Sequence, residues 1–494
     1  MIILPVLLPL FTGILNLLAW RAVRLQKIFS LVGATLQLGA GLWLLLNVQH
    51  NGIQHLQVGS WPAPFGIVLV ADLFSAIMVT VAAIVALAVA VYSIAAIDLR
   101  RAQVGYYALF FFLLMGVNGA FITGDLFNLY VWFEVMLMAS FVMLALGGER
   151  PQIEGAIKYV ILNLLSSTLF LSAIGLLYNL VGTLNMADLA RRLPQLEAGS
   201  QVTLVAVLFL VAFGIKSAIF PLFFWLPASY HTPPVAITAL FSGLLTKVGV
   251  YALMRVFTLL FLQDLAYTHT LLLVIAGFTM VTGVFGAAAQ TDFRRLLSFH
   301  IISQIGYLLM GLGLFSQPAL AASIFFMVHV ILAKSSLFLI AGIVEKMDGS
   351  FNLKELGGIY TGRFAVALLF LLPALSLAGL PPLSGFFAKL ALIVAGIELK
   401  QYLIVAVALA VSLMTLYSMT KVWNEAFWKE KKAPVQEPAH QPISAWLWAP
   451  VAALVLLSLL AGLLAEPLLN LAGQVAAQLS DPSIYIGAVL GGLP

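Results

Sequence analysis

Residues 215–227 read Ile-Lys-Ser-Ala-Ile-Phe-Pro-Leu-Phe-Phe-Trp-Leu-Pro and place Lys216 and two prolines in an apolar run. The run belongs to a longer hydrophobic segment, residues 201–226, which is long enough to cross a bilayer core of about 30 Å. Proline removes a helical hydrogen bond and clashes with the preceding turn, so Pro221 and Pro227 predict an interrupted helix. Unwound backbone at membrane depth is tolerated only where protein or a wet cavity surrounds it. The stretch therefore predicts a broken transmembrane helix with a charged side chain beside the break.

The composition of the whole chain agrees with a membrane protein. Its 494 residues are 63% hydrophobic and 9% charged, and the mean hydropathy is +1.09. Soluble domains carry roughly 25% charged residues, so this composition cannot build a water-exposed surface for a chain of this size. The net charge of +5 arises from lysines and arginines in short loops and inside the spans, and it does not indicate a nucleic-acid surface. Cysteine is absent, which excludes disulfides and cysteine-ligated zinc sites or clusters.

Apolar runs between charged or Pro-, Gly- and Asn-rich breaks predict an all-α polytopic membrane protein of about fourteen transmembrane helices. The expected spans are residues 2–20, 28–47, 67–97, 104–123, 125–147, 157–182, 201–226, 234–258, 267–289, 296–316, 318–344, 363–398, 400–427 and 446–472. Basic residues follow the first span rather than precede it, which is typical of a membrane helix and not of a cleavable signal. The runs 67–97 and 363–398 are long for one crossing and predict tilt or interruption. The polar connections near 183–200, 345–362 and 428–445 are expected to be loops.

The basic residues predict the orientation of the chain. With the N-terminus outside, the inside loops hold 15 of the 24 lysines and arginines, the outside loops hold 3, and the spans hold the other 6. Cytoplasmic loops of membrane proteins carry the excess of positive charge. The bias predicts that both termini lie outside and that the number of helices is even.

A second proline-rich break predicts an inverted repeat. Residues 380–386 read Leu-Pro-Pro-Leu-Ser-Gly-Phe and interrupt the twelfth span, five helices after the break in the seventh. A unit of five helices returns in the opposite orientation, and transporters often place such breaks at equivalent positions of two halves. Helices 4–8 and 9–13 are therefore candidates for inverted repeats, with Lys216 and Lys389 on the outer side of their breaks. The alternative is that the prolines only kink packed helices.

Ionisable side chains inside the spans are the candidate functional residues. An ionised group at the bilayer centre costs about 2.5–3.5 kcal/mol on insertion scales, so a row of such groups needs a reason. The candidates for a proton relay are Glu134, Lys216, Lys247, Lys389, His329, Lys334 and His300. Burial disfavours the charged form of lysine and a nearby carboxylate favours it, so a Glu134–Lys216 pair of changing separation is expected to hold or release a proton. Released protons are expected to pass through Lys247, then His329 or Lys334, to Lys389, with water in the gaps.

Other polar residues near the spans have structural interpretations. Arg255 and Lys421 lie near helix ends, where long basic side chains more often reach the interface. Asp72 and Asp125 precede apolar runs and are expected to cap helices, and His300 is open between packing and relay. The sequence contains no phosphate-binding loop, zinc-protease motif or dinucleotide fingerprint, so no cofactor and no metal are expected.

Four stretches resemble the proton-antiporter membrane subunits shared by Mrp-type cation/proton antiporters and respiratory complex I. They are Gly-Asp-Leu-Phe-Asn-Leu-Tyr-Val-Trp-Phe-Glu at 124–134, residues 215–227 with His231, Phe-Ser-Gly-Leu-Leu-Thr-Lys-Val-Gly at 241–249, and Thr-Asp-Phe-Arg-Arg-Leu-Leu-Ser at 291–298 continuing to Ser303-Gln304-Ile305-Gly306-Tyr307. With residues 329–338 and 381–389, the resemblance covers roughly residues 65–430. It implies fourteen helices, inverted five-helix repeats and broken helices 7 and 12. It also implies a functional glutamate on helix 5, matched by Glu134, and lysines on helices 7, 8 and 12, matched by Lys216, Lys247 and Lys389.

The expected function is that of a proton-translocating subunit of a multisubunit Na⁺/H⁺ antiporter in a bacterial plasma membrane, which is a transporter subunit and not an enzyme. The wording of residues 124–134 and the chain length resemble the D subunits of Mrp antiporters most. The expected partners are the other membrane subunits of a hetero-oligomeric complex, protons and monovalent cations. One alternative is a proton-pumping subunit of complex I or a membrane hydrogenase, and another is a scaffold whose charges only pack helices.

The expected division of the chain follows the repeats. Residues 1–100 hold helices 1–3, residues 101–260 the first repeat, residues 261–430 the second repeat, and residues 431–494 helix 14 and the tail.

Overall fold

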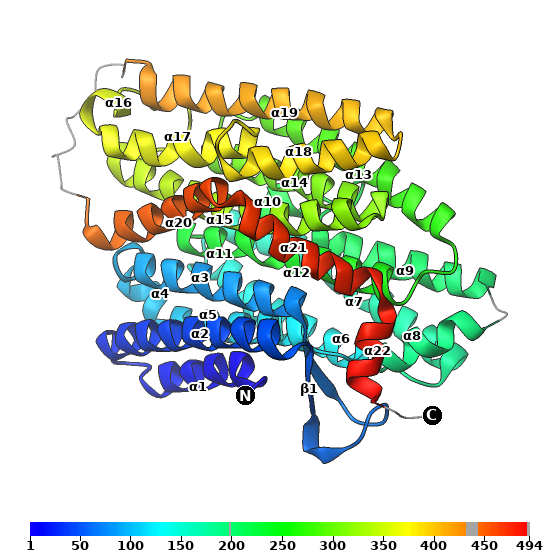
Figure 1. Cartoon of the computed structure of the whole chain (residues 1–494). Coiled ribbons are helices and arrows are strands. Elements are labelled where there is room, and N and C mark those ends of the chain that lie inside the picture. The colour runs from blue at the N-terminus through cyan, green and yellow to red at the C-terminus, as the bar shows by residue number, and fades with distance from the viewer. Residues whose placement is uncertain (197–198, 431–442, 492–494) are drawn as a thin grey trace.

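The computed structural model of the chain is 81% helical, and it describes residues 1–196, 199–430 and 443–491. In this part of the chain, eleven helices are long and apolar enough to cross a membrane, and three shorter apolar helices join them. Together they account for the fourteen predicted crossings. Figure 1 shows α1 (Leu4–Leu18) and α2 (Val23–Asn51) along one edge of the bundle, and α19 (Tyr402–Val422) along the opposite edge.

Crossings 1 to 8 come from the first half of the chain. After α1 and α2, their helices are α3 Leu73–Ala96, α5 Tyr106–Ile122, α6 Leu126–Ala145, α7 Arg150–Val181, α9 Gly199–Ser217 with α10 Trp225–Ser229, and α11 Val235–Gly243 with α12 Leu245–Leu259. The connections contain α4 Leu99–Gln103, α8 Met186–Arg192 and an antiparallel hairpin of β1 Gln54–Gln57 and β2 Val68–Ala71. Strand β2 explains why the apolar run from residue 67 is too long for one crossing, since its helix begins only at Leu73.

Crossings 9 to 14 come from the second half. Their helices are α13 Leu265–Ala289, α14 Phe293–Leu314, α15 Gln317–Asp348, α17 Phe364–Ala378 with α18 Ser384–Glu398, α19, and α20 Ala445–Leu463 continued by α21 Ala465–Ser480. Two short helices, α16 Ile359–Gly362 and α22 Pro482–Leu490, lie in connections. Figure 1 shows α20 and α21 running obliquely across the front of the bundle, with the N-terminus and α22 at the same end.

Several expected boundaries differ from the structure. The expected loop at 183–200 contains α8, and that at 345–362 contains the end of α15 and α16. Helix 14 extends past residue 472, because α21 continues to Ser480. Of the expected inside linker, residues 431–442 lie outside the described part of the chain.

Short polar side chains fix the starts of several helices. Asp72 accepts the backbone N–H of Ser75 and forms a capping box at the start of α3. Asp125 and Asp292 accept the third backbone N–H after them, at the starts of α6 and α14. A carboxylate at an N-terminus satisfies an orphan donor and interacts favourably with the helix dipole. The predicted capping role of Asp72 and Asp125 matches this geometry.

Equivalent elements recur at a constant shift of 167 residues, from Asp125 to Asp292 and from Asn185 to Asn352. Asp125 bridges Asn185 through isolated antiparallel pairing, and Asp292 bridges Asn352 in the same way. Helix α7 and helix α15 both have 32 residues, proline in the first turn and a left-handed glycine immediately after the end. Five crossings separate the two copies, so they run in opposite directions. The fold therefore contains the predicted inverted repeats of helices 4–8 and 9–13.

The two predicted breaks occur in helices 7 and 12. Helix α9 ends at Ser217, and helical structure resumes only in α10, while α17 ends at Ala378 and α18 begins at Ser384. The chain turns with positive φ at Ala218 in the first break and at Gly379 in the second. Helix 8 is also interrupted, at Leu244 between α11 and α12. No proline marks that position, and the sequence did not predict the interruption.

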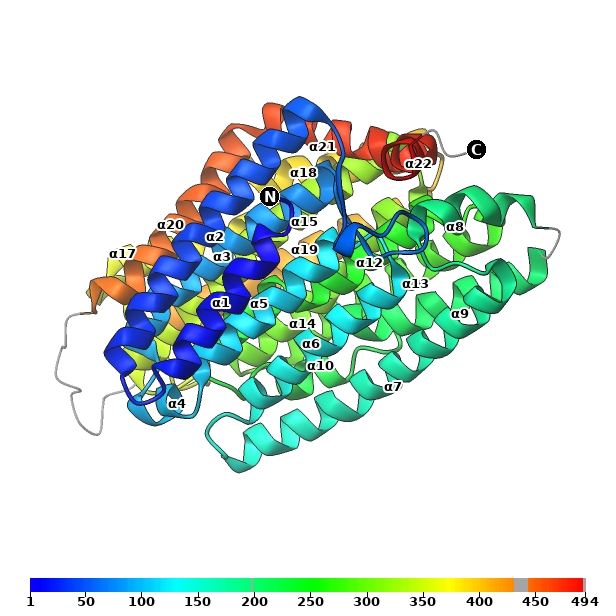
Figure 2. The same cartoon turned by 90° about the horizontal axis from the view of Figure 1, so that it is seen from below.

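The core of the bundle is built from crossing 8, α14, α15 and α3. Crossing 8 is completely buried in the bundle, and α14, α15 and α3 are mostly buried. Helices α7 and α9 lie at the periphery, on the side of the bundle away from α17 and α20 (Figure 2). Lys247, His300, His329 and Lys334 thus lie on helices that are shielded from lipid.

Candidate functional site

Lys216 occupies the last turn of α9, immediately before the first break. Its side chain is buried, and Nζ donates to the main-chain oxygen of Asn163 at 3.2 Å and to Ser167 Oγ at 3.1 Å. Nζ also lies 5.7 Å from the centre of the Phe133 ring. Hydrogen bonds to an ammonium group are among the stronger ones in proteins. The site can therefore hold a proton on Lys216 without a carboxylate in direct contact.

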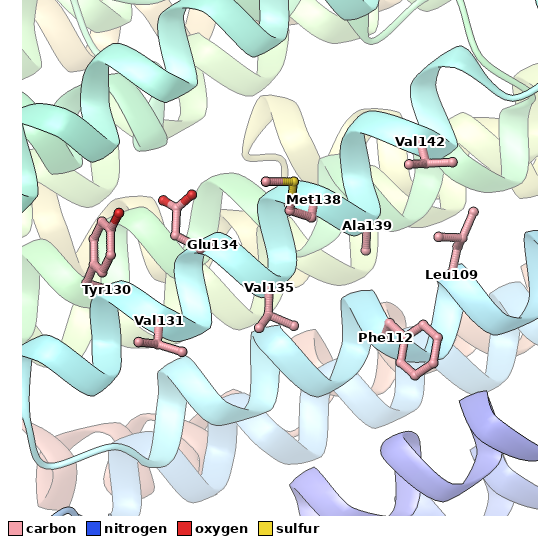
Figure 3. A pocket seen from close by; sticks show the side chains of 9 residues that line it. All are labelled: Leu109, Phe112, Tyr130, Val131, Glu134, Val135, Met138, Ala139 and Val142. Carbon is pink, nitrogen blue, oxygen red and sulfur yellow. The ribbon is translucent and has the colours of Figure 1, made fainter.

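Glu134 is half-buried on α6 and lines a cavity of about 520 Å³ between α5 and α6. Figure 3 shows its carboxylate on the same side of α6 as the ring of Tyr130, among otherwise apolar side chains. Within residues 1–196, 199–430 and 443–491, Oε1 has no hydrogen-bond partner, and no ion pair joins Glu134 to Lys216. The two charges interact through space, and the ring next to Lys216 belongs to Phe133, the residue immediately before Glu134. The predicted pair is thus an electrostatic one and not a contact.

Lys247 and Lys389 are both held by carbonyl oxygens at the ends of half-helices. Lys247 Nζ donates to Ser242 O at 2.6 Å, at the end of α11. Lys389 Nζ donates to Leu377 O at 2.9 Å and Ala378 O at 3.4 Å, at the end of α17. The C-terminal end of a helix carries a partial negative charge, which favours a cation there. The breaks therefore supply the negative ends that stabilise these two ammonium groups.

Lys389 has two further neighbours, both on helices of the second repeat. Its Nζ donates to Ser412 Oγ on α19 at 3.0 Å and lies 4.6 Å from the centre of the Tyr307 ring on α14. The Tyr307 hydroxyl in turn donates to Ala408 O and contacts Ser412 Oγ. Lys389 is consequently surrounded by α14, α17 and α19.

His329 and His300 lie near Lys334 and Lys389, and Lys334 is also near Lys247. Lys334 Nζ donates to Leu297 O at 3.4 Å, and it interacts electrostatically with Lys247 and Lys389. His329 Nδ1 lies 2.8 Å from Ser384 Oγ, the first residue after the second break, and His300 Nε2 lies 2.6 Å from Ser418 Oγ. The structure thus brings Lys247, Lys334 and Lys389 into one group with both histidines, while Glu134 and Lys216 form a second group.

In the part of the chain that the structure describes, several buried polar atoms near Lys334 and Lys389 have no hydrogen-bond partner. Among the described residues, such atoms include His300 Nδ1, His329 Nε2, Ser303 Oγ and both polar atoms of the Gln304 side chain. Buried polar groups in native proteins are nearly always hydrogen-bonded, so these atoms are the candidate partners for bound water in this group. Gln304 shares a face of α14 with His300 and Tyr307, since positions three and four apart are neighbours on a helix.

The sequence did not indicate which neutral side chains bind the relay candidates. Ser167, Ser412 and Ser384 each bond a predicted relay residue, yet serines are too frequent in membrane helices to be singled out. What distinguishes these serines from others is their position, either beside a helix break or on a helix that faces a lysine. That position becomes visible once the helix neighbours are known.

Two other charged residues have roles different from a relay. Lys421 donates to Ala288 O and Gln290 O and so caps the end of α13, which agrees with its structural interpretation. Arg255 does not reach the interface, contrary to the expectation. It is buried and paired with Asp72 at 2.6 Å, because the start of α3 places a carboxylate beside it.

Two groups in connections outside the membrane-spanning helices have shifted pKa values. Burial lowers the pKa of His231, which lies between α10 and α11 and contacts Pro227 O. Burial alone would raise the pKa of Asp98, but the backbone N–H and guanidinium of Arg101 outweigh it and hold that pKa below its usual value. Asp98 is therefore ionised and His231 neutral near pH 7.

Comparison with known proteins places these features in a family. Residues 123–415 match the family described as NADH:quinone oxidoreductase/Mrp antiporter, TM. The D subunit of the Na⁺/H⁺ antiporter of Alkalihalophilus pseudofirmus is 48% identical over 490 residues, with 99% of both chains covered. The D subunit of the Na⁺/H⁺ antiporter of Bacillus subtilis is 40% identical over 489 residues, also with 99% of both chains covered.

Solved structures agree over the full length. A chain in the structure of the Mrp complex from Dietzia sp. superimposes with a TM-score of 0.92 at 35% identity, covering 99% of each chain. A chain of respiratory complex I from Thermus thermophilus gives a TM-score of 0.83 at 26% identity, covering 97% of this chain and all of that one. The broken helices, the inverted repeat and the buried lysines therefore occur in a chain that belongs to the family of membrane subunits shared by NADH:quinone oxidoreductase and Mrp antiporters.

Proposed function

We propose that this chain is the proton-translocating subunit of a multisubunit Na⁺/H⁺ antiporter in a bacterial plasma membrane. The observation that carries the proposal is the row of buried lysines, each held by neutral oxygens at or opposite a helix break. A lysine bound only by neutral acceptors can lose its proton without leaving an unpaired charge behind. The names of the relatives as Na⁺/H⁺ antiporter subunits support the exchanged ions and the multisubunit setting.

The proposed relay begins at the pair of Glu134 and Lys216. The carboxylate favours the charged form of Lys216 from a distance, so a change in its hydration or separation shifts the proton of Lys216. That proton then moves to the group of Lys247, Lys334 and Lys389, with His329 and His300 as intermediate carriers. Water at the partnerless atoms of Gln304 and the histidines bridges the gaps.

The orientation and the division of the chain are part of the proposal. The excess of basic residues in alternate loops supports an orientation in which both termini lie outside. The N-terminus and α22 lie at the same end of the bundle (Figure 1), which fits an even number of crossings. The constant shift of 167 residues supports repeats within residues 101–260 and 261–430, preceded by residues 1–100. The last part, residues 431–494, holds helix 14 and includes positions 431–442 outside the described chain.

A redox-driven pump is a second candidate. The chains of respiratory complex I and of an archaeal membrane-bound sulfane sulfur reductase, with a TM-score of 0.90 at 26% identity for the latter, show that the same fold also occurs in redox complexes. Purification of the tagged chain in mild detergent decides between the two settings. Small hydrophobic membrane subunits as partners support the antiporter, whereas flavin or iron–sulfur subunits favour the pump.

The relay itself is tested with Lys216→Ala in everted vesicles that contain the whole complex. Na⁺ addition should collapse the pH gradient with the wild type and leave it unchanged with Lys216→Ala, while the subunits remain assembled. The matched control is Lys158→Ala, since Lys158 is exposed and, among the described residues, its ion pair is with Glu154 one turn away on α7. Undiminished exchange in assembled Lys216→Ala would remove the proposed role of Lys216.

A further inference from the structure

Helix α12 carries a polar row that leads away from Lys247. Tyr251 follows Lys247 by four residues and Arg255 by eight, so all three lie on one face of the helix. Eight residues correspond to roughly 12 Å along the axis. The row leads from Lys247 towards Tyr485 of α22, which lies against Arg255. Figure 1 shows α22 at the same end of the bundle as the N-terminus, which we call the terminal end.

Arg255 is fixed at the far end of this row. Its Nη1 lies 2.6 Å from Asp72 Oδ2, and both side chains are buried. Its Nη2 donates to the Tyr251 hydroxyl at 2.9 Å. The guanidinium also faces the rings of Phe74 and Tyr485 at 5.9 and 5.4 Å. A planar guanidinium with this many partners has little freedom to move.

The direction of the hydrogen bonds prevents proton transfer through the row. Tyr251 donates its only proton to Phe121 O at 2.6 Å and accepts from Arg255. A main-chain carbonyl does not take up that proton, and an arginine does not release one. The remaining oxygen of Asp72, Oδ1, accepts the backbone N–H of Ser75 at 2.9 Å. The Tyr251 hydroxyl, the two terminal nitrogens of Arg255 and the two carboxylate oxygens of Asp72 are thus each bound to a group that does not exchange a proton with them.

The C-terminal helices close the same place from the terminal end. Tyr485 of α22 contacts Arg255 through its ring, and Gln478 Oε1 of α21 accepts the backbone N–H of Leu73 at 3.3 Å. Both contacts cover the start of α3, where Asp72 lies. Tyr485 and Gln478 thus bring α22 and α21 beside the Arg255–Asp72 pair.

We propose that Tyr251, Arg255 and Asp72 form a proton seal between Lys247 and the terminal end of the bundle. The Arg255–Asp72 pair carries no net charge, so the barrier comes from side chains that are fixed by their partners and offer no proton acceptor or donor for a relay. A proton on Lys247 is thereby prevented from leaving along α12 and moves sideways to Lys334 and Lys389. The inference rests on the proposed function only in so far as Lys247 carries a transported proton. These three are positioning residues, since they direct the path without carrying the proton.

The test measures proton leak without Na⁺ in proteoliposomes of the whole complex, in choline medium, from the decay of an imposed pH gradient. The double variant Arg255→Gln with Asp72→Asn removes the fixed ion pair and shortens the side chain at position 255, which admits water. It should raise the leak about tenfold, equal to lowering the barrier by about 1.4 kcal/mol. Adding Lys247→Ala to that variant should return the leak to the wild-type rate. The matched control is Asp98→Asn with Arg101→Gln, an ion pair at the opposite end of α3, and it should not leak.

A general loosening of the fold would also leak, but Lys247→Ala would not stop it, and that result overturns the seal. A wild-type leak rate in the assembled double variant overturns it as well. If the double variant does not assemble, the test uses Tyr251→Phe, which removes the hydroxyl oxygen and leaves the Arg255–Asp72 ion pair in place. A leak at least twice that of the wild type supports the seal, and an unchanged leak refutes it. Na⁺-driven exchange of the wild type, measured separately in the same proteoliposomes, tests the proposed function and not the seal.

Discussion

Ser167→Ala is the sharpest test of how Lys216 is held. The substitution removes one of the two acceptors of the Lys216 ammonium and leaves only Asn163 O at 3.2 Å. A hydrogen bond to a charged group contributes about 1.5–3 kcal/mol. If protonation of Lys216 is part of every cycle, that loss corresponds to a decrease in exchange of roughly 10- to 100-fold.

The adjacent Ser166 provides a matched control. It is equally buried, but its hydroxyl donates to Ala212 O and not to a charged group. Ser166→Ala should therefore retain exchange within about a factor of ten of the wild type, since a neutral hydrogen bond contributes only about 0.5–1.5 kcal/mol. The assay is Na⁺-dependent collapse of the pH gradient in everted vesicles, normalised to the amount of assembled complex. Equal activity of the two variants would refute the reasoning about Lys216.

The remaining predictions concern packing, a histidine and a surface charge. Gly249→Ala places a methyl group 2.5 Å from Ser217 Oγ, so it should destabilise the protein by about 1–3 kcal/mol, seen as a lower melting temperature of the purified complex. Ser384→Ala removes the 2.8 Å contact to His329. It should slow Na⁺-dependent exchange clearly, while the melting temperature should fall only slightly. Asp98→Asn keeps a helix cap but loses a charge whose pKa is lowered by folding. The wild type should therefore melt higher near pH 7 and lose that advantage as the pH falls below about 3.9.

Each of these predictions has a contrasting case. At Gly175 an added methyl group would meet no described atom within 4 Å, so Gly175→Ala should melt like the wild type, and an equal loss there would contradict the packing argument. Ser458 contacts Ser384 only at 3.4 Å, and Ser458→Ala should exchange normally. For Asp98→Asn, a melting difference that is the same at pH 7 and pH 3 would show that the charge contributes nothing.

The sequence predicted the crossings and the two breaks because both depend on local chemistry. Hydrophobic length defines a span, and prolines at 221, 381 and 382 interrupt a helix wherever its neighbours lie. The interruption at Leu244 has no such residue, and it appears only with the contact between Lys247 and Ser242 O. Helix 14 also exceeded its predicted end, since α21 is amphipathic and packs on α15 despite its polar residues.

The sequence predicted the charged residues of the candidate site but not the groups that bind them. A buried lysine or glutamate is conspicuous in an apolar span, whatever surrounds it. Which oxygen binds Lys216 or Lys389 depends on helices that are distant in sequence, such as α7 and α19. The wrong expectation for Arg255 has the same cause, because its partner Asp72 precedes it by more than 180 residues in the chain.

The carbonyl oxygens that hold Lys247 and Lys389 have a consequence for mutagenesis. Ser242, Leu377 and Ala378 contribute only main-chain atoms to these hydrogen bonds. Replacement of their side chains leaves the acceptors in place, so alanine scanning will report these positions as unimportant. Only a change in the backbone, such as an inserted residue or an ester in place of an amide, can reveal that part of the transport path.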